Sequence, residues 1–243
     1  MSILSEHECS STGEIGLQTE PAADASPQQS SVAEPARKLR LKARAERMGE
    51  TRKRIARATY ELHASVGPAR TTVSAIAERA GVQRLTVYKH FPHDRDILQA
   101  CTTYHLELDP PPDPARWHQI VDPEQRLRLA LAELYPYYRR NETLFANTGR
   151  DIALILEQME GAPPSGLRAF MDLPSQLHAA LAVGWPEDDQ QAALRNAALA
   201  LAIDFATWRT LARGQYLEDV ETIELMVALV TCAAAPSSSA TPY

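Results

Sequence analysis

The apolar residues of this chain recur at steps of three and four along most of its length, and this spacing constrains the fold more than any other feature. Val73, Ile76 and Ala80 share one helical face, and Ile223 and Val227 repeat the pattern near the C-terminus. Such spacing is typical of amphipathic helices, whereas half-buried strands alternate apolar and polar residues. No stretch sustains that alternation. The sequence therefore predicts an all-α protein, and its 44% apolar content is enough for a sizeable core.

The charged residues are distributed unevenly along the chain. Residues 1–36 contain six acidic residues and neither Lys nor Arg, whereas residues 37–100 contain fifteen basic and six acidic residues. Residues 101–243 are acidic again, with ten basic and nineteen acidic residues. A basic segment inside a chain of formal net charge −6 indicates a surface that binds a polyanion.

A helix, a short turn and a second short helix are predicted between residues 71 and 91. The hydroxyl oxygen of Thr71 or Thr72 can cap the first of these helices. Gly81 allows the left-handed backbone that a sharp turn needs. The second helix is expected at about residues 83–91 and ends at the following proline. This is a helix-turn-helix arrangement, which can place its second helix in the major groove of DNA.

The side chains of that second helix are expected to divide between two faces. Val87 and Phe91 face the core together with Val82, and they fix the angle of the helix. The outward set combines cations, hydroxyl donors and an aromatic ring, which suits phosphate contact and the reading of base edges. The outward residues are Arg84, Leu85, Thr86, Tyr88, Lys89 and His90.

The run T-T-V-S-A-I-A-E-R-A-G-V at residues 71–82, followed by T-V-Y-K-H-F at residues 86–91, resembles the TetR family of repressors. The resemblance covers about fifty residues. It implies that Thr72, Thr86, Tyr88 and His90 touch phosphates, and that Ser74, Arg84 and Leu85 touch bases. Two positions depart from the family pattern. Gln83, which is also among the expected DNA-binding residues, replaces a capping serine, so a weak cap is expected at the start of the second helix. Asp94, beside Arg95, replaces a phosphate-binding lysine.

A basic arm runs from Arg37 to Arg44 and continues to Arg54, and the first helix is expected at about residues 49–65. On DNA the arm could follow the backbone or enter the minor groove. The alternative is a solvated basic extension of the first helix. Both interpretations stay open, although cations near a helix start oppose the helix dipole and favour an external partner.

The later helices are predicted from caps, prolines and apolar spacing. Asp122-Pro123-Glu124 is a helix start, because Asp caps well and Pro suits the first helical position. A kink is expected at Pro136 and a break near Pro174. The predicted helices span about residues 122–140, 142–159, 167–183, 187–213 and 217–234.

Residues 187–213 are apolar around most of the helix circumference, so this helix is expected to be buried on more than one side. The resembled family forms a four-helix dimer interface from its last two long helices, which implies a homodimer. The alternative is that both are core helices of a monomer. The expected interface residues are Ala198, Ala202, Val220, Ile223, Met226, Val227 and Val230.

A small apolar or aromatic effector is the expected ligand of the larger domain. Aromatic residues could form the walls of its pocket, although an aromatic ring on an apolar helix face also serves as core. The candidate pocket residues are Tyr104, Trp117, Tyr135, Tyr138, Phe145, Phe170, Phe205 and Trp208.

The sequence shows no glycine-rich phosphate loop, no metal-ligand spacing and no nucleophile motif, so neither an enzyme nor a bound cofactor or metal is expected. The cysteines Cys9, Cys101 and Cys232 lie far apart, which fits a reducing compartment. There is neither a long apolar run nor a secretory signal, so we expect a cytoplasmic protein without a membrane span.

Together these features predict a transcriptional regulator, a repressor, that binds a pseudo-palindromic double-stranded DNA operator under the control of its effector. An architectural DNA-binding protein without a ligand is the alternative, and a ligand-dependent loss of operator affinity would separate the two. The expected segments are a disordered acidic then basic arm at 1–45, a three-helix DNA-binding domain at 46–100, a helical regulatory and dimerisation domain at 101–235, and a disordered tail at 236–243.

Overall fold

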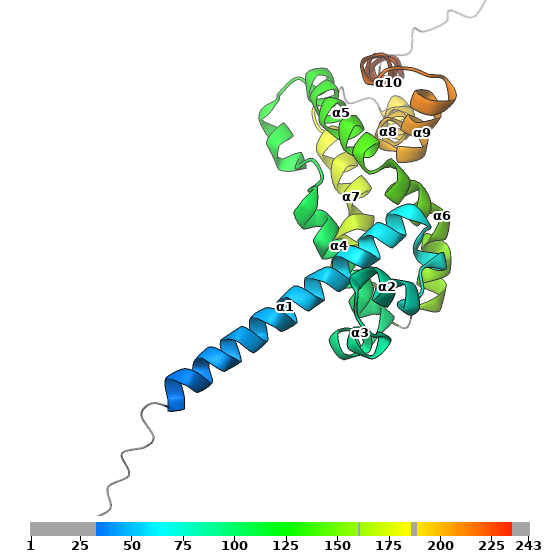
Figure 1. Cartoon of the computed structure of the whole chain (residues 1–243). Coiled ribbons are helices and arrows are strands. Elements are labelled where there is room, and N and C mark those ends of the chain that lie inside the picture. The colour runs from blue at the N-terminus through cyan, green and yellow to red at the C-terminus, as the bar shows by residue number, and fades with distance from the viewer. Residues whose placement is uncertain (1–32, 160, 186–188, 235–243) are drawn as a thin grey trace, which may run out of the picture. The chain divides into compact units, whose positions relative to one another are not determined.

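The computed structural model describes residues 33–159, 161–185 and 189–234 (Figure 1). Helices dominate these residues, and none of the described residues lies in a strand, which confirms the all-α prediction. The chain divides into two compact units, Met1–Glu46 and Arg47–Tyr243. Those parts of the predicted disordered segments that fall at 1–32 and 236–243 lie outside the described residues.

Helix α1 covers Ala33–Ser65, and its residues up to Glu46 belong to the first unit. It begins well before the expected start near Gly49, so residues 33–45 are helical and the prediction of disorder there was wrong. Residues 37–48 are rich in Ala, Leu, Arg and Lys and contain neither Gly nor Pro, and these residues have high helix propensity. Low apolar content prevents a segment from building a core, but it does not prevent a helix.

The second unit opens with the helix-turn-helix region. Ile55 of α1 is fully buried there against Val87 and Phe91, and this small core holds the short helices together. The elements that follow α1 are the 3₁₀ turn η1 (Pro68–Arg70), α2 (Val73–Ala80), α3 (Arg84–His90) and α4 (Asp94–Leu108).

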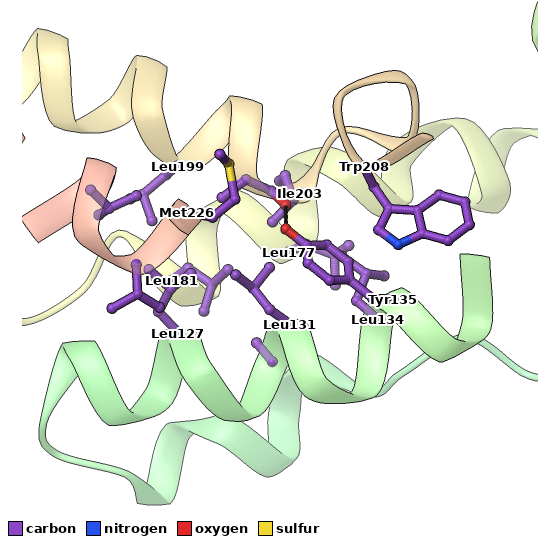
Figure 2. Close-up of a cluster of buried hydrophobic side chains, with 14 of the residues drawn as sticks. Leu127, Leu131, Leu134, Tyr135, Leu177, Leu181, Leu199, Ile203, Trp208 and Met226 are labelled. Carbon is purple, nitrogen blue, oxygen red and sulfur yellow. Dashed lines mark hydrogen bonds between the residues drawn. The ribbon is translucent and has the colours of Figure 1, made fainter. Parts of the chain in front are cut away.

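The rest of the second unit is built around α5 (Pro123–Arg140). Figure 2 shows Leu127, Leu131, Leu134 and Tyr135 of this helix pointing toward the helices that follow it. Asp122 caps α5 by accepting a hydrogen bond from the Glu124 amide at 3.0 Å, as predicted. The other elements are η2 (Pro114–Gln119), α6 (Glu142–Gln158), α7 (Ser165–Leu181), α8 (Asp189–Ile203), α9 (Phe205–Arg209), a π-helical turn (Thr210–Gly214) and α10 (Asp219–Ala234).

The observed helix boundaries differ from the predicted ones at one proline, Pro174, and one aspartate, Asp204. Helix α7 continues through Pro174, where a break was expected. The predicted helix 187–213 is interrupted at Asp204, which caps α9 by accepting from the Thr207 amide at 2.7 Å. The carbonyls that end α8 are satisfied from α5, because Tyr135 donates to the Ala202 carbonyl at 2.9 Å and Tyr138 donates to that of Ile203. Apolar spacing continues across this break, so it could not be seen in the sequence.

Candidate DNA-binding and effector sites

The turn between α2 and α3 has the local geometry that the sequence predicted. The hydroxyl of Thr72 accepts a hydrogen bond from the Ala75 amide at 3.2 Å and caps α2. Gly81 ends α2 with φ 64°, a left-handed conformation that glycine adopts without strain. Gln83 occupies the cap position of α3 but makes no capping hydrogen bond with its side chain, in agreement with the weak cap expected there.

One face of α3 is fixed in the core and the other is free. Val87 and Phe91 are fully buried, whereas Leu85 is 61% and Tyr88 42% exposed. The nine predicted DNA-contacting residues lie on α3 and at the start of α2, and they are exposed or half-buried. The exposed residues are Thr72, Ser74, Gln83, Arg84, Leu85, Tyr88 and Lys89, and the half-buried ones are Thr86 and His90.

Arg52 was grouped with the basic arm in the sequence, but the structure gives it a different contact. Its Nη1 atom donates to the carbonyl of His90 at 2.7 Å, and its guanidinium lies 4.2 Å from the centre of the Phe91 ring. Arg52 therefore ties α1 to the C-terminal end of α3, where a cation also interacts favourably with the helix dipole. No sequence spacing connects these positions, which explains why this role was missed.

A second set of polar contacts joins α6 to the end of α1. Asn147 donates to the Ala64 carbonyl at 2.8 Å, and Arg150 donates to that of Val66 at 3.1 Å. Asp151 accepts from the Ala69 amide at 3.1 Å, and its bond to the Arg150 guanidinium holds its pKa below the usual value. Gly67, with φ 95°, leaves space for these side chains, because a Cβ there would overlap Arg150 and Asp151.

The same helix α6 also lines a large cavity in the second unit. This cavity measures about 1420 Å³, is open to solvent, and is lined by α5, α6, α7, α8, α9 and the π-helical turn. Thr148, Gly149 and Ile152 line it, although the neighbouring residues Asn147 and Asp151 hold the end of α1. Helix α6 is thus shared between the cavity and the helix-turn-helix region.

Four of the eight predicted pocket residues line this cavity, namely Tyr138, Phe145, Phe170 and Phe205. The others do not. Trp117 and Tyr135 are fully buried in the core, and Trp208 is buried with its indole nitrogen donating to Asp219 at 3.2 Å. Tyr104 stands outside the cavity against Tyr60, with ring centres 5.6 Å apart. Helical spacing finds an apolar face but cannot show which part of that face borders a hollow.

The cavity also has a charged end that the sequence did not reveal. Arg209 and Arg213 line it, and both guanidiniums bond to the single carboxylate of Glu142, at 3.3 Å and 2.8 Å at the closest. These contacts lower the pKa of Glu142 and keep it ionised. The spacing of Arg209 and Arg213, one helical turn apart, was the available signal.

Most of the residues predicted to form a dimer interface are buried within the chain. Ala198, Ala202, Met226, Val227 and Val230 are buried inside the chain itself, Ile223 is half-buried, and Val220 is 70% exposed. Different residues leave an apolar stripe open to solvent. They are Leu194, Ala197 and Leu201 on α8, and Leu225 and Leu229 on α10. The prediction selected the stripe that packs on the chain's own core, because both faces of α8 are apolar.

A buried pair of titratable groups joins the last turn of α1 to α4. His63 is 3.5 Å from the Cys101 sulfur, and burial lowers the pKa of His63 to about 4. Burial also raises the pKa of Cys101 to about 12, so both groups are neutral near pH 7. Among the described residues no cluster of three or more potential metal ligands occurs, and no helix there is long and apolar enough to cross a membrane.

Comparison with known proteins agrees with the geometry of the helix-turn-helix. Residues 55–101 match the family model described as "Bacterial regulatory proteins, tetR family". Over 78 residues the chain is 42% identical to the HTH-type transcriptional regulator SrpR of Pseudomonas putida, covering 30% of this chain and 37% of SrpR. Over 78 residues it is also 40% identical to the uncharacterized HTH-type regulator TtgW of Pseudomonas putida, covering 30% of this chain and 58% of TtgW.

The chain therefore spans less than two thirds of the length of these curated relatives. A crystal structure of a HlyIIR mutant that carries a GSSGSSG linker has the same fold, with a TM-score of 0.50 and 15% identity. That likeness covers 76% of this chain and 97% of the other, so the shared fold includes helices that follow the helix-turn-helix. Residues 55–101 are thus similar to the tetR family of bacterial regulatory proteins, and the likeness in fold extends further along the chain.

Proposed function

We propose that the protein is a dimeric transcriptional regulator, a repressor, that binds a pseudo-palindromic operator through α3 and responds to a small-molecule effector in its cavity. The observation that carries the proposal is the two-sided character of α3. Its inner residues Val87 and Phe91 are fully buried, so the helix presents its exposed side chains from a fixed position. A regulator of this kind acts in the cytoplasm, where its operator is accessible.

The exposed side chains of α3 and the start of α2 divide into two roles. Arg84 is the first residue of α3, the part of a recognition helix that enters the major groove, and it can donate two hydrogen bonds to guanine. Leu85 suits contact with a thymine methyl group. Phosphate contact is assigned to Thr72, Thr86, Tyr88, Lys89 and His90, and Ser74 and Gln83 complete the surface.

Control by an effector is supported by the position of α6. A ligand between α6 and α7 would touch Thr148 and Ile152, and adjacent side chains of α6 hold the carbonyls of Ala64 and Val66 at the end of α1. A ligand shifts such an equilibrium only by its differential affinity for the two states. A coupling of about 1–3 kcal/mol changes DNA affinity by roughly 5–150-fold.

Dimerisation is supported by the apolar stripes of α8 and α10. Leu194 is 64% exposed and Leu201 49%, and large apolar side chains gathered on one surface are typical of an interface. A two-fold dimer presents two copies of α3, so its operator is expected to contain inverted half-sites.

The proposal is tested by selecting bound duplexes from a random DNA library with the full chain. Enrichment of an inverted repeat, bound far more tightly than random DNA, is the expected result. Enrichment of no sequence would overturn the regulator and favour an architectural DNA-binding protein. Compounds that raise the melting temperature are then added to the operator complex, and an unchanged operator affinity with every such compound would overturn effector control.

A further inference from the structure

The wall of the cavity has an apolar part and a charged part, and the two adjoin along α9. In the apolar part, the ring of Phe145 contacts those of Phe170 and Phe205 at ring-centre distances of 5.3 Å and 5.5 Å. The other part carries Arg209 and Arg213 on α9 and the π-helical turn. A pocket of this kind suits a ligand that has both an apolar body and a polar group.

The backbone around the charged end is irregular. Asp204 interrupts the helix before Phe205, and the turn Thr210–Gly214 is π-helical. Both irregularities border the cavity, and the π-helical turn carries Arg213. Such π-helical turns are found frequently at functional sites, because they redirect side chains that a regular helix would place elsewhere.

At the charged end, both arginines have N–H donors that no described protein group accepts. Arg209 uses Nε toward Glu142, and within the described residues neither of its Nη atoms has a hydrogen-bond partner. Arg213 uses Nε and Nη2 toward the same carboxylate, at 2.9 Å and 2.8 Å. One carboxylate thus serves two guanidiniums, and the planar end of Arg209 has the geometry for a bidentate bond to a second carboxylate.

The remaining ionisable groups of the cavity wall, Asp204 and His178, each make hydrogen bonds within the protein. One oxygen of Asp204 accepts from the amide of Thr207 at 2.7 Å and from its hydroxyl at 2.9 Å, so this carboxylate serves the first turn of α9. The imidazole of His178 is hydrogen-bonded to the Asn196 carbonyl at 3.1 Å. Among the described residues, the atoms of ionisable groups left without a partner at the charged end are both Nη atoms of Arg209 and Nη1 of Arg213, against one oxygen of Asp204, so donors outnumber acceptors there.

We propose that the cavity takes an amphipathic carboxylate, with an acyl or aromatic body against Phe145, Phe170 and Phe205 and its carboxylate bound by Arg209 and Arg213. This inference rests on the proposed effector function and specifies the chemical class of the ligand. The guanidiniums bind the carboxylate of such a ligand, and the aromatic wall contacts its apolar body.

Three probes with the same ten-carbon chain test the proposal, namely decanoate, decanol and decyltrimethylammonium, each below its micelle concentration. Their binding to the full chain is measured by calorimetry without DNA. Decanoate is expected to bind on the order of tenfold or more tightly than the other two, as charge-assisted hydrogen bonds require. Equal or tighter binding of the alcohol or the ammonium compound would overturn the carboxylate assignment, as would no binding of decanoate.

Arg209→Gln is the decisive variant, with Arg213→Gln as a second in case the first fails to fold. Either is expected to weaken decanoate by about tenfold or more and to leave decanol unchanged. Arg168→Gln, an exposed arginine on α7 that does not line the cavity, is the matched control and is expected to change neither. Decanoate binding that survives both cavity variants would contradict the proposal. Operator selection is measured separately, so a failure of the ligand class is distinguishable from a failure of the regulator function.

Discussion

The Nη1 atom of Arg52 donates a 2.7 Å hydrogen bond to the carbonyl of His90, which lies 38 residues further along the chain. The same guanidinium lies over the Phe91 ring, so one side chain of α1 holds the C-terminal end of α3. A residue that belongs to a basic segment by sequence thus positions α3, and if α3 binds DNA as proposed, the effect of this residue on DNA binding should differ from that of its cationic neighbours.

Arg52→Met is expected to weaken operator binding without changing the slope of log affinity against log salt, because the side chain fixes α3 and does not neutralise a phosphate. Lys53→Met is the matched control on the adjacent exposed cation. If Lys53 contacts a phosphate, its loss lowers the slope by about one unit. The measurement is fluorescence anisotropy across a salt series. A drop of one slope unit for Arg52→Met would show that Arg52 binds phosphate.

Asn147→Ala removes the hydrogen bond from α6 to the Ala64 carbonyl while leaving the cavity-lining neighbours in place. We expect ligand binding to be preserved and the ligand-induced change in operator affinity to shrink several-fold. The checks are calorimetry for the ligand and anisotropy for the DNA. Gln158→Ala, at the exposed end of α6, serves as the control. Undiminished coupling in the Asn147 variant would exclude this contact as the route.

Features of the fold and of the candidate site could be predicted from the sequence where neighbouring residues determine them. The caps at Thr72 and Asp122 and the left-handed turn at Gly81 were found because each acts within one helical turn. The contact of Arg52 with His90 and the donation of Tyr135 to the Ala202 carbonyl join segments far apart in sequence. Periodicity carries no information about such contacts.

The same reason explains why the proposed dimer surface differs from the one expected from the sequence. Spacing identified two apolar faces on the helix from residue 187 onward, but it could not show which face covers the chain's own core. Ala202 is fully buried in this chain, whereas Leu201, one residue earlier, is 49% exposed. A single position therefore separates core from surface.

Leu201→Glu is expected to give a folded monomer, because the charge would be buried without a partner at the apolar interface. Ala202→Glu is the contrasting variant, and it should destabilise the fold itself by several kcal/mol, since residue 202 is fully buried. Sedimentation reports the mass and urea unfolding reports the stability. A Leu201→Glu protein that stays dimeric at micromolar concentration would remove α8 from the interface.

We expect His63 to make the stability of the second unit depend on pH. Burial lowers its folded pKa to about 4, and an unfolded histidine titrates near pH 6.5. Between these values the unfolded state binds more protons, so the free energy of unfolding falls as the pH drops from about 6.5 to about 4, by about 3 kcal/mol in all. Cys101 of α4 and Asp151 of α6 are the titratable groups near the ring.

His63→Leu is expected to flatten this part of the stability profile, measured by urea unfolding at several pH values. His118→Gln, an exposed histidine on η2, is the control and should keep the wild-type slope. His105 is also buried, and burial lowers its pKa, so part of the slope survives in the His63 variant. An identical slope in wild type and His63→Leu would contradict the assignment.

The most direct test of sequence-specific DNA recognition is the affinity of Arg84→Ala for the selected operator and for random DNA of the same length. If α3 reads bases through Arg84, operator affinity should fall by about 1–3 kcal/mol, random-DNA affinity should change little, and the preference at one base pair in each half-site should relax. An equal loss on both DNAs would contradict the account, because Arg84 would then be a phosphate contact like Lys89.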